Sequence, residues 1–313
     1  IPNEKLMLSP GMKAIFRIKT EIKPEPPARE EIKKAKQTQQ KKVRTKKIDF
    51  EVSAGISHSD PGDFYYRASG IDTLVDQYIK NYGLEYSVSG EFGKNIFYFP
   101  LNATMNYQVS SKLYLKGGLE FGYGNQSNEK TYTLNWGSFS EDSRYKLAST
   151  LMYFMPFFGA ETRFGDFGIY ANVCFNFMSL SHQKNIELSE PTYWYKKNDD
   201  ISASGSGFGI LLGGKYTFEL GKKLNLLVKL EFCYLKIGKL TGTRDTAISN
   251  SAGESFFESV DGTIYSFEMN PYDMGWFNSW ELYDSIPTDS WIRNINELTF
   301  NLSSIRLMVG FVF

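Results

Sequence analysis

Apolar and polar residues alternate along much of the chain from Ile48 to Phe313, with the two-residue period of a β-strand that has one apolar face. In the first such segment Ile48, Phe50 and Val52 alternate with polar residues. The pattern recurs in eight segments, which are 48–57, 96–109, 113–124, 150–164, 167–180, 207–220, 224–237 and 304–313. We therefore expect eight antiparallel strands, each with one apolar face.

The connections between these segments separate the fold classes that share such alternation, among them lipocalins and sandwiches. From the second strand onward, tight joints at 110–112, 165–166 and 221–223 alternate with long connections. Short turns at one end and long loops at the other are typical of transmembrane barrels, in which the short turns are periplasmic. The long connections, expected to be extracellular loops, are 58–94, 125–146, 181–203 and 241–298.

The segment 58–94 leaves the strand count open. Residues 71–82 resemble a short amphipathic helix, and 83–92 alternate like a strand. Counting 83–92 as a membrane strand would give nine, whereas bacterial single-chain barrels have even numbers. We predict eight strands, with 83–92 as a loop strand or an extension of the second strand, and keep ten as the alternative.

Composition agrees with a membrane protein that crosses by strands. Aromatic residues make up 16% of the chain, and the longest apolar run, Leu151–Ala160, is shorter than the ~18 residues that a spanning helix needs. The predicted fold class is therefore an all-β, transmembrane, antiparallel up-and-down barrel over 48–313. The sequence starts at Ile1 without an apolar leader, so if the chain is exported we expect its signal peptide to have been removed already.

Residues 1–47 form a separate basic tail. They contain 14 Lys/Arg against 5 Asp/Glu and almost nothing to bury, so we expect disorder or partial helix. An even strand number places this tail and Phe313 on the same, periplasmic side. One interpretation of this tail is contact with a periplasmic partner, anionic lipid head groups or the cell wall, and the alternative is a solvated tether; nucleic acid is not expected.

The polar face of the strands predicts a charge network inside the barrel. Unpaired charges in a narrow interior cost several kcal/mol or more, so acids and bases must pair there. Six acids face five bases, and these are Asp49, Glu51, Glu120, Glu161, Glu219 and Glu231 with Lys116, Arg163, Lys215, Lys229 and Arg306.

The carboxyl end resembles the β-signal of outer-membrane proteins, with alternating apolar residues and a terminal Phe, at Ile305, Leu307, Val309, Phe311 and Phe313. The layout of 48–313 is similar to small eight-stranded barrels of the OmpA and OmpX kind. This resemblance implies a Gram-negative outer-membrane location, contact with outer-membrane lipid and lipopolysaccharide, and transient contact with the barrel-assembly machinery.

Candidate chemistry is sparse. The two histidines, His58 and His182, lie at strand-loop boundaries with Ser near both and Asp near His58, and a hydrolase would need such residues to converge. We expect no enzyme activity and no cofactor.

The loop 241–298 is acidic and aromatic, with 10 Asp/Glu against 2 Lys/Arg. Its candidate interaction surface consists of Trp276, Trp280, Trp291, Asp273 and Glu281. Such a surface suits a partner, a sugar or Ca²⁺. The alternative is that these aromatics form the small core which a long loop needs.

The favoured function is a non-enzymatic barrel with a structural or surface-interaction role. A small-solute, porin-like channel is the alternative, although balanced charges in a narrow eight-stranded lumen count against it. An outer-membrane lipid or peptide hydrolase is the third hypothesis.

Overall fold

The computed structural model describes residues 48–59, 66–93, 96–221, 224–270 and 276–313. Within these ranges the chain is largely antiparallel β-sheet, with one helix, α2 (Tyr66–Tyr82). No helix in the described ranges is long and apolar enough to cross a membrane. The basic tail predicted for 1–47 lies outside the described residues.

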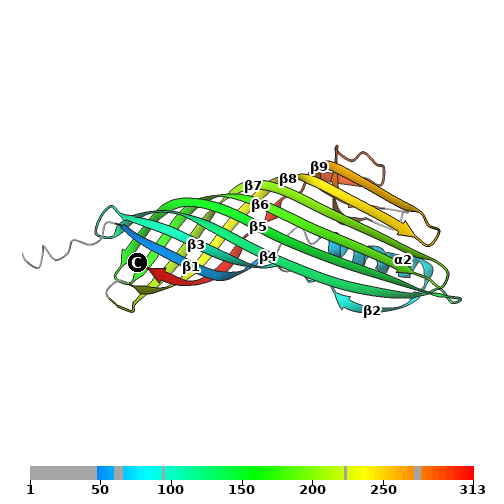
Figure 1. Ribbon diagram of the computed structural model, residues 1–313, viewed down its shortest axis with the longest axis horizontal. Coiled ribbons are helices and arrows are strands. Elements are labelled where there is room, and N and C mark those ends of the chain that lie inside the picture. Colours follow the sequence, from blue (N-terminus) through cyan, green and yellow to red (C-terminus); the bar gives the residue numbers. More distant parts are fainter. Residues whose placement is uncertain (1–47, 60–65, 94–95, 222–223, 271–275) are drawn as a thin grey trace, which may run out of the picture. The chain divides into compact units, whose positions relative to one another are not determined.

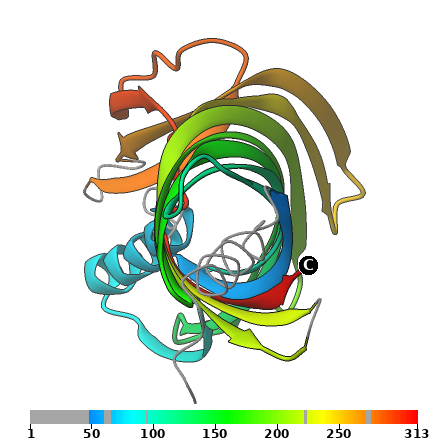
Figure 2. The same cartoon turned by 90° about the vertical axis from the view of Figure 1, so that its left-hand side faces the viewer.

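Eight strands form a closed ring (Figures 1 and 2). Each pairs antiparallel with the next, and the last, β13, pairs with both β8 and β1, which closes the ring. The prediction of eight strands is confirmed, and the alternative of ten is wrong. The ring strands are β1 (Ile48–Ser59), β3 (Ile96–Gln108), β4 (Leu113–Asn135), β5 (Ser140–Phe164), β6 (Phe167–Ser189), β7 (Trp194–Glu219), β8 (Asn225–Asn250) and β13 (Ser304–Val312).

The long connections, expected from the sequence to be loops, consist largely of paired strands. β4 and β5 stay paired out to Asn135 and Ser140, and β6 and β7 stay paired out to Ser189 and Trp194. The expectation failed because the outward side chains there are polar, so the apolar alternation stops while the backbone ladder continues. We call the continuing part, residues 125–150, 179–206 and 236–269, the extension.

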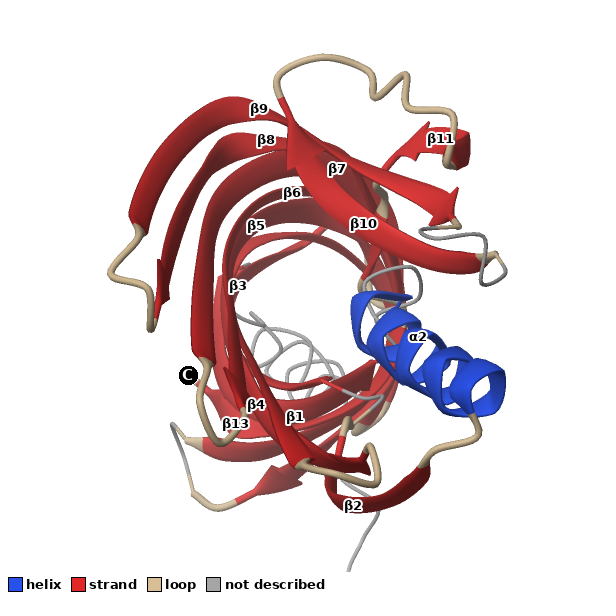
Figure 3. Ribbon diagram, turned by 90° about the vertical axis from the view of Figure 1, so that its right-hand side faces the viewer, coloured by secondary structure: helices blue, strands red, loops and turns tan. Residues whose placement is uncertain are grey.

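Most of the remaining elements pair with the extension or pack on it. β2 (Glu85–Glu91) pairs with the far part of β4 at 129–135, beyond the end of β3, which agrees with the predicted loop strand or extension of the second strand. The helix expected over 71–82 is α2, whose buried Ile71, Val75 and Ile79 pack with Tyr132 and Leu147. After β8 the chain forms β9 (Ser255–Met269), β10 (Phe277–Tyr283), β11 (Ile292–Glu297) and β12 (Phe300–Asn301) (Figure 3).

A hydrogen bond and an ion pair fix α2 to β4. The Tyr132 hydroxyl donates to the Asp72 carboxylate, and Lys130 Nζ lies 2.6 Å from Asp72 Oδ1. Burial, together with the hydrogen bond to Asp72, raises the pKa of Tyr132. The phenol therefore stays a neutral donor, and the helix is tied to the sheet by polar contacts as well as by its apolar face.

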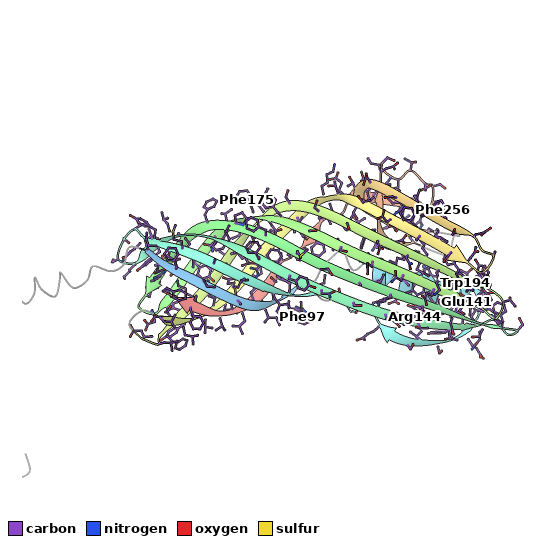
Figure 4. The ribbon with its side chains drawn as sticks, in the orientation of Figure 1. Phe97, Glu141, Arg144, Phe175, Trp194 and Phe256 are labelled. Atoms are coloured by element: carbon purple, nitrogen blue, oxygen red, sulfur yellow. The ribbon has the colours of Figure 1, made fainter. Side chains whose placement is uncertain are left out.

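The outward side chains of the ring strands form an apolar band that ends abruptly. On β6 the outward residues are apolar up to Phe177 and polar from Ser179 onward. On β7 the change falls between Phe208 and Ser206, and Phe177 lies opposite Ser206 in the ladder. Figure 4 shows Phe97 and Phe175 on the wall of the ring, and Arg144, Trp194 and Phe256 in the extension.

The same change occurs on the neighbouring strands. It falls between Tyr123 and Asn125 on β4, and between Tyr234 and Lys236 on β8. Asn125 and Thr150 face each other in the ladder, so β5 changes at the same level as β4. The border therefore crosses neighbouring strands as a stepped line. It is level between β4 and β5, and it shifts by one facing pair at each of the next three joints, where Met152 faces Ser179, Phe177 faces Ser206 and Phe208 faces Lys236.

Candidate functional site

The interior next to the tight turns contains a network of buried ions. Glu51 lies at its centre, with its carboxylate 3.1 Å from Lys229 Nζ and 3.7 Å from Lys116 Nζ, and it also pairs with Lys215. These groups come from β1, β4, β7 and β8. Opposite strands of the ring are therefore linked through one carboxylate.

Glu161 of β5 extends this network. Its carboxylate lies 2.8 Å from Lys116 Nζ and 2.7 Å from Lys215 Nζ, and it also pairs with Arg163. The Arg163 guanidinium in turn lies 2.6 Å from Asp49. Since each buried carboxylate meets at least one cation, the network satisfies the requirement for charge pairing in a narrow interior.

A second group of ions centres on Arg306 of β13, which has no exposed surface. Its Nη1 lies 2.6 Å from Glu120 Oε1 and 3.9 Å from Glu231 Oε2. The Tyr153 hydroxyl donates to Glu120 at 2.8 Å, and the Tyr170 hydroxyl donates to Glu231 at 2.6 Å. The guanidinium is thus enclosed by two carboxylates, each of which accepts a hydrogen bond from a tyrosine.

Glycines make room for these two tyrosine rings. A Cβ at Gly122 would overlap the Tyr153 ring, and one at Gly213 would come within 2.5 Å of the Tyr170 ring. The tyrosine partners were not predicted as site residues. An inward glycine beside a polar-face aromatic was the signal that could have identified them, because small residues admit bulky neighbours across a narrow lumen.

Of the eleven residues predicted for the charge network, Glu219 differs from the expectation. It is exposed at the last residue of β7, where water can solvate its carboxylate. The other ten all lie in the ion pairs described above. They comprise five acids and five bases, so the group is neutral.

Beyond Arg306 the interior is filled by apolar side chains. Leu298, Phe300 and Leu302, which precede β13, are almost entirely buried there. Trp280 of β10 is also fully buried and lies against His182, with ring centroids 4.9 Å apart. The ring strands contribute Leu151, Met155, Cys174, Met178, Leu180, Cys233, Leu235 and Ile237. Segments that come back from the extension therefore help to fill the barrel.

The predicted aromatic and acidic surface in 241–298 does not form one continuous face. Trp280 belongs to the interior core, and Glu281 Oε1 lies 3.6 Å from Arg244. Trp276 and Trp291 are partly exposed, and the Arg293 guanidinium lies 3.8 Å above the Trp276 ring. Asp273 lies outside the described residues. Trp280 is therefore a core residue, in line with the alternative interpretation of the loop aromatics. Trp276 and Trp291 lie at the surface.

No group of three or more His, Cys, Asp or Glu residues that could hold a metal ion occurs in the described part of the chain. The two histidines have different surroundings. His58 is exposed and packs on Phe97, with ring centroids 5.0 Å apart. His182 is buried, and its Nδ1 lies 2.9 Å from Ser149 Oγ on the adjacent strand.

The segment that resembles a β-signal has the predicted alternation. Its apolar residues point outward and are exposed, while Arg306 and Met308 between them are fully buried. The Phe313 N–H donates to the Phe50 carbonyl at 2.9 Å, which continues the pairing of β13 with β1. The outward residues are Ile305, Leu307, Val309, Phe311 and Phe313.

No family model and no curated protein matches the sequence. Among solved structures, the chain is similar to the translocator domain of the autotransporter NalP from Neisseria meningitidis, at 9% identity and with a TM-score of 0.20. That match covers 91% of this chain and 94% of the other. A TM-score this low does not show a shared fold, so the ring of eight strands rests on the strand pairings within this chain.

Proposed function

We propose that the chain is a non-enzymatic outer-membrane β-barrel, with a structural or surface-interaction role carried by the extension. The apolar band and its border, which shifts by no more than one facing pair from β4 through β8, are the observation that carries this proposal. The band spans about 11 residues of β6, Phe167–Phe177, which is the length of a tilted strand that crosses a bilayer. At ~3.3 Å per residue and a tilt near 45°, it covers roughly 25 Å of membrane thickness.

The proposed orientation follows from the connections. The tight turns between β3 and β4, β5 and β6, and β7 and β8 all lie at the end opposite the extension. Short turns are periplasmic in bacterial barrels, so the extension is outside the cell and both termini are periplasmic. Outer-membrane lipid, including lipopolysaccharide, would surround the band. The assembly machinery would read the β-signal, and the tail 1–47 would meet its partner in the periplasm.

The filled interior favours a closed barrel over a small-solute channel. Ions and tyrosines occupy one part of it, and a core that includes Trp280 occupies the next.

A hydrolase is disfavoured by the surroundings of its best candidate catalytic pair. Ser149 and His182 are both buried, and Trp280 packs on the imidazole, so a substrate has no direct approach from the Trp280 side.

Two substitutions on the outward face of β7 test the membrane placement. Leu212→Arg, inside the band, should lower the free energy of unfolding by about 2–4 kcal/mol in phosphatidylcholine vesicles, because a cation would face hydrocarbon. Ser202→Arg, on the same face but in the extension, should change it by less than about 0.5 kcal/mol. Urea unfolding followed by tryptophan fluorescence measures both. Equal and small effects would refute the proposal.

A further inference from the structure

One edge of the extension has no strand partner over several residues. Thr263 of β9 pairs with Thr241 of β8 on one side and with Tyr283 of β10 on the other. From 255 to 262, β9 pairs with β8 alone, and no strand among the described residues pairs with its other side. Figure 3 shows this part of β9 as the outermost strand. We call residues 255–261 the β9 edge.

Hydrogen bonds on the partnered side show which backbone groups face outward. The Asn250 N–H donates to the Glu254 carbonyl, and the Leu298 N–H donates to the Ile264 carbonyl. The backbone N–H and C=O groups of even-numbered β9 residues therefore point toward β8 and, where β8 no longer pairs with β9, toward β11 and Leu298. Because successive residues of a strand alternate, Ser255, Phe257, Ser259 and Asp261 direct their N–H and C=O groups to the open side.

The β9 edge has only one of the usual protections of an exposed edge, the charges of Glu258 and Asp261. Natural edges are protected by charged side chains, above all Lys, by Pro, by bulges or by short length. There is no Lys, Arg or Pro between 245 and 270, and the register of β8 with β9 is regular. Phe256 and Phe257 are 53% and 67% exposed and point to opposite faces of the sheet. The opposite edge of the sheet, β2, is short and contains Gly90 at a φ of 83°.

The negative charge around the β9 edge indicates which kind of segment can bind there. Nine Asp/Glu and no Lys/Arg lie between 245 and 292. Glu254, Glu258 and Asp261 belong to β9 or to the turn before it. Arg244 of β8 neutralises part of their charge, since its Nη2 lies 3.6 Å from Glu258 Oε2, but acids remain in excess. A second copy pairing there would therefore bring like charges together, which destabilises a ladder. A cationic segment would meet opposite charge instead.

We propose that the β9 edge binds an extended, cationic segment of a partner protein, which adds to the sheet as a further strand. Backbone hydrogen bonds would supply affinity, the two phenylalanines would cover its side chains, and the acids would select positive charge. This inference rests on the proposed function, since it needs the extension to lie outside the membrane.

Peptide binding to the full chain in detergent micelles tests the inference. The probe is a fluorescent, acetylated peptide of alternating Lys and Val, compared with one of alternating Glu and Val by anisotropy. We expect the Lys peptide to bind at least about tenfold more tightly. Ser259→Pro removes an N–H from the open side without changing charge, and it should weaken binding by about tenfold or more.

Two matched variants isolate the effect of the edge. Ser259→Ala removes the hydroxyl that donates to Asp245 at 2.5 Å but keeps the N–H, and Val88→Pro places proline on β2 instead. Both should bind the Lys peptide within about twofold of the parent.

Three outcomes would overturn the inference. The first is unchanged binding by Ser259→Pro, and the second is equal binding of the Lys and Glu peptides. The third is a dimer in sedimentation experiments that Ser259→Pro dissolves, because it would make a second copy the occupant. None of these bears on the Leu212→Arg comparison, so the proposed membrane placement succeeds or fails separately.

Discussion

Replacing Arg306 by Met is expected to lower the free energy of unfolding by about 3–5 kcal/mol, because it leaves a buried carboxylate without its cation. Arg306 has no exposed surface, and its Nη1 lies 2.6 Å from Glu120 and 3.9 Å from Glu231. The measurement is urea unfolding of the full chain in lipid vesicles.

Two further variants separate charge pairing from loss of volume. Adding Glu120→Gln to Arg306→Met neutralises the carboxylate at the shorter distance and should restore a large part of the lost stability. Arg144→Met removes an exposed pair with Glu129 and should cost less than about 1 kcal/mol. If Arg306→Met and Arg144→Met were equally mild, the interior network would not contribute to stability as argued.

Trp280→Ala is expected to cost about 3–5 kcal/mol, because it opens a large cavity in the core beyond Arg306. Trp280 is fully buried and packs on His182. Trp276→Ala and Trp291→Ala are the matched controls, since both residues are partly exposed in the same part of the chain.

These controls should each cost about 1 kcal/mol or less, the larger loss falling on Trp276, which stacks with Arg293. Unfolding in urea again provides the readout. Similar losses at all three positions would mean that Trp280 is a surface residue and that the interior is not filled as described.

The ring of strands was predictable because one physical rule governs each band segment. Outward positions are apolar, whereas inward positions include most of the polar and charged residues, so Ile48, Phe50 and Val52 mark the outward face and Glu51 the inward one. The tight turns then determined the order of the strands. The charge network was predictable for a related reason, since an enclosed ion must meet a counter-ion.

Glu219 shows the limit of that rule. Alternation assigns it to the inward face, but it lies at the last residue of β7, where the strand reaches water. A period of two specifies a face and carries no information about depth along the barrel axis.

The extension was not predictable from alternation of apolar residues. The outward face of β6 is apolar at Phe175 and Phe177 and becomes polar at Ser179, Ser181 and Gln183, although the ladder of β6 with β7 continues through all of them. The buried position of Trp280 depends on a return of the chain into the barrel, which no local pattern in 241–298 encodes. The β9 edge was missed for the same reason, because an unpaired side depends on which strands lie next to β9.

The proposed function places the border of the apolar band at the outer surface of a membrane, and spin labels along one strand measure this directly. Single cysteines would replace outward residues of β7, from Ser202 through Ser206, Phe208 and Leu212, in lipid vesicles. Cys174 and Cys233 are fully buried, so labelling of the folded chain is specific for the introduced thiol.

Collision with oxygen reports lipid, and collision with a water-soluble nickel complex reports water. The labels at 202 and 206 should favour nickel, and those at 208 and 212 should favour oxygen, so the preference changes between 206 and 208, where the outward residues change from Ser to Phe. Preference for nickel at all four positions, or a change at another level of β7, would contradict the membrane placement.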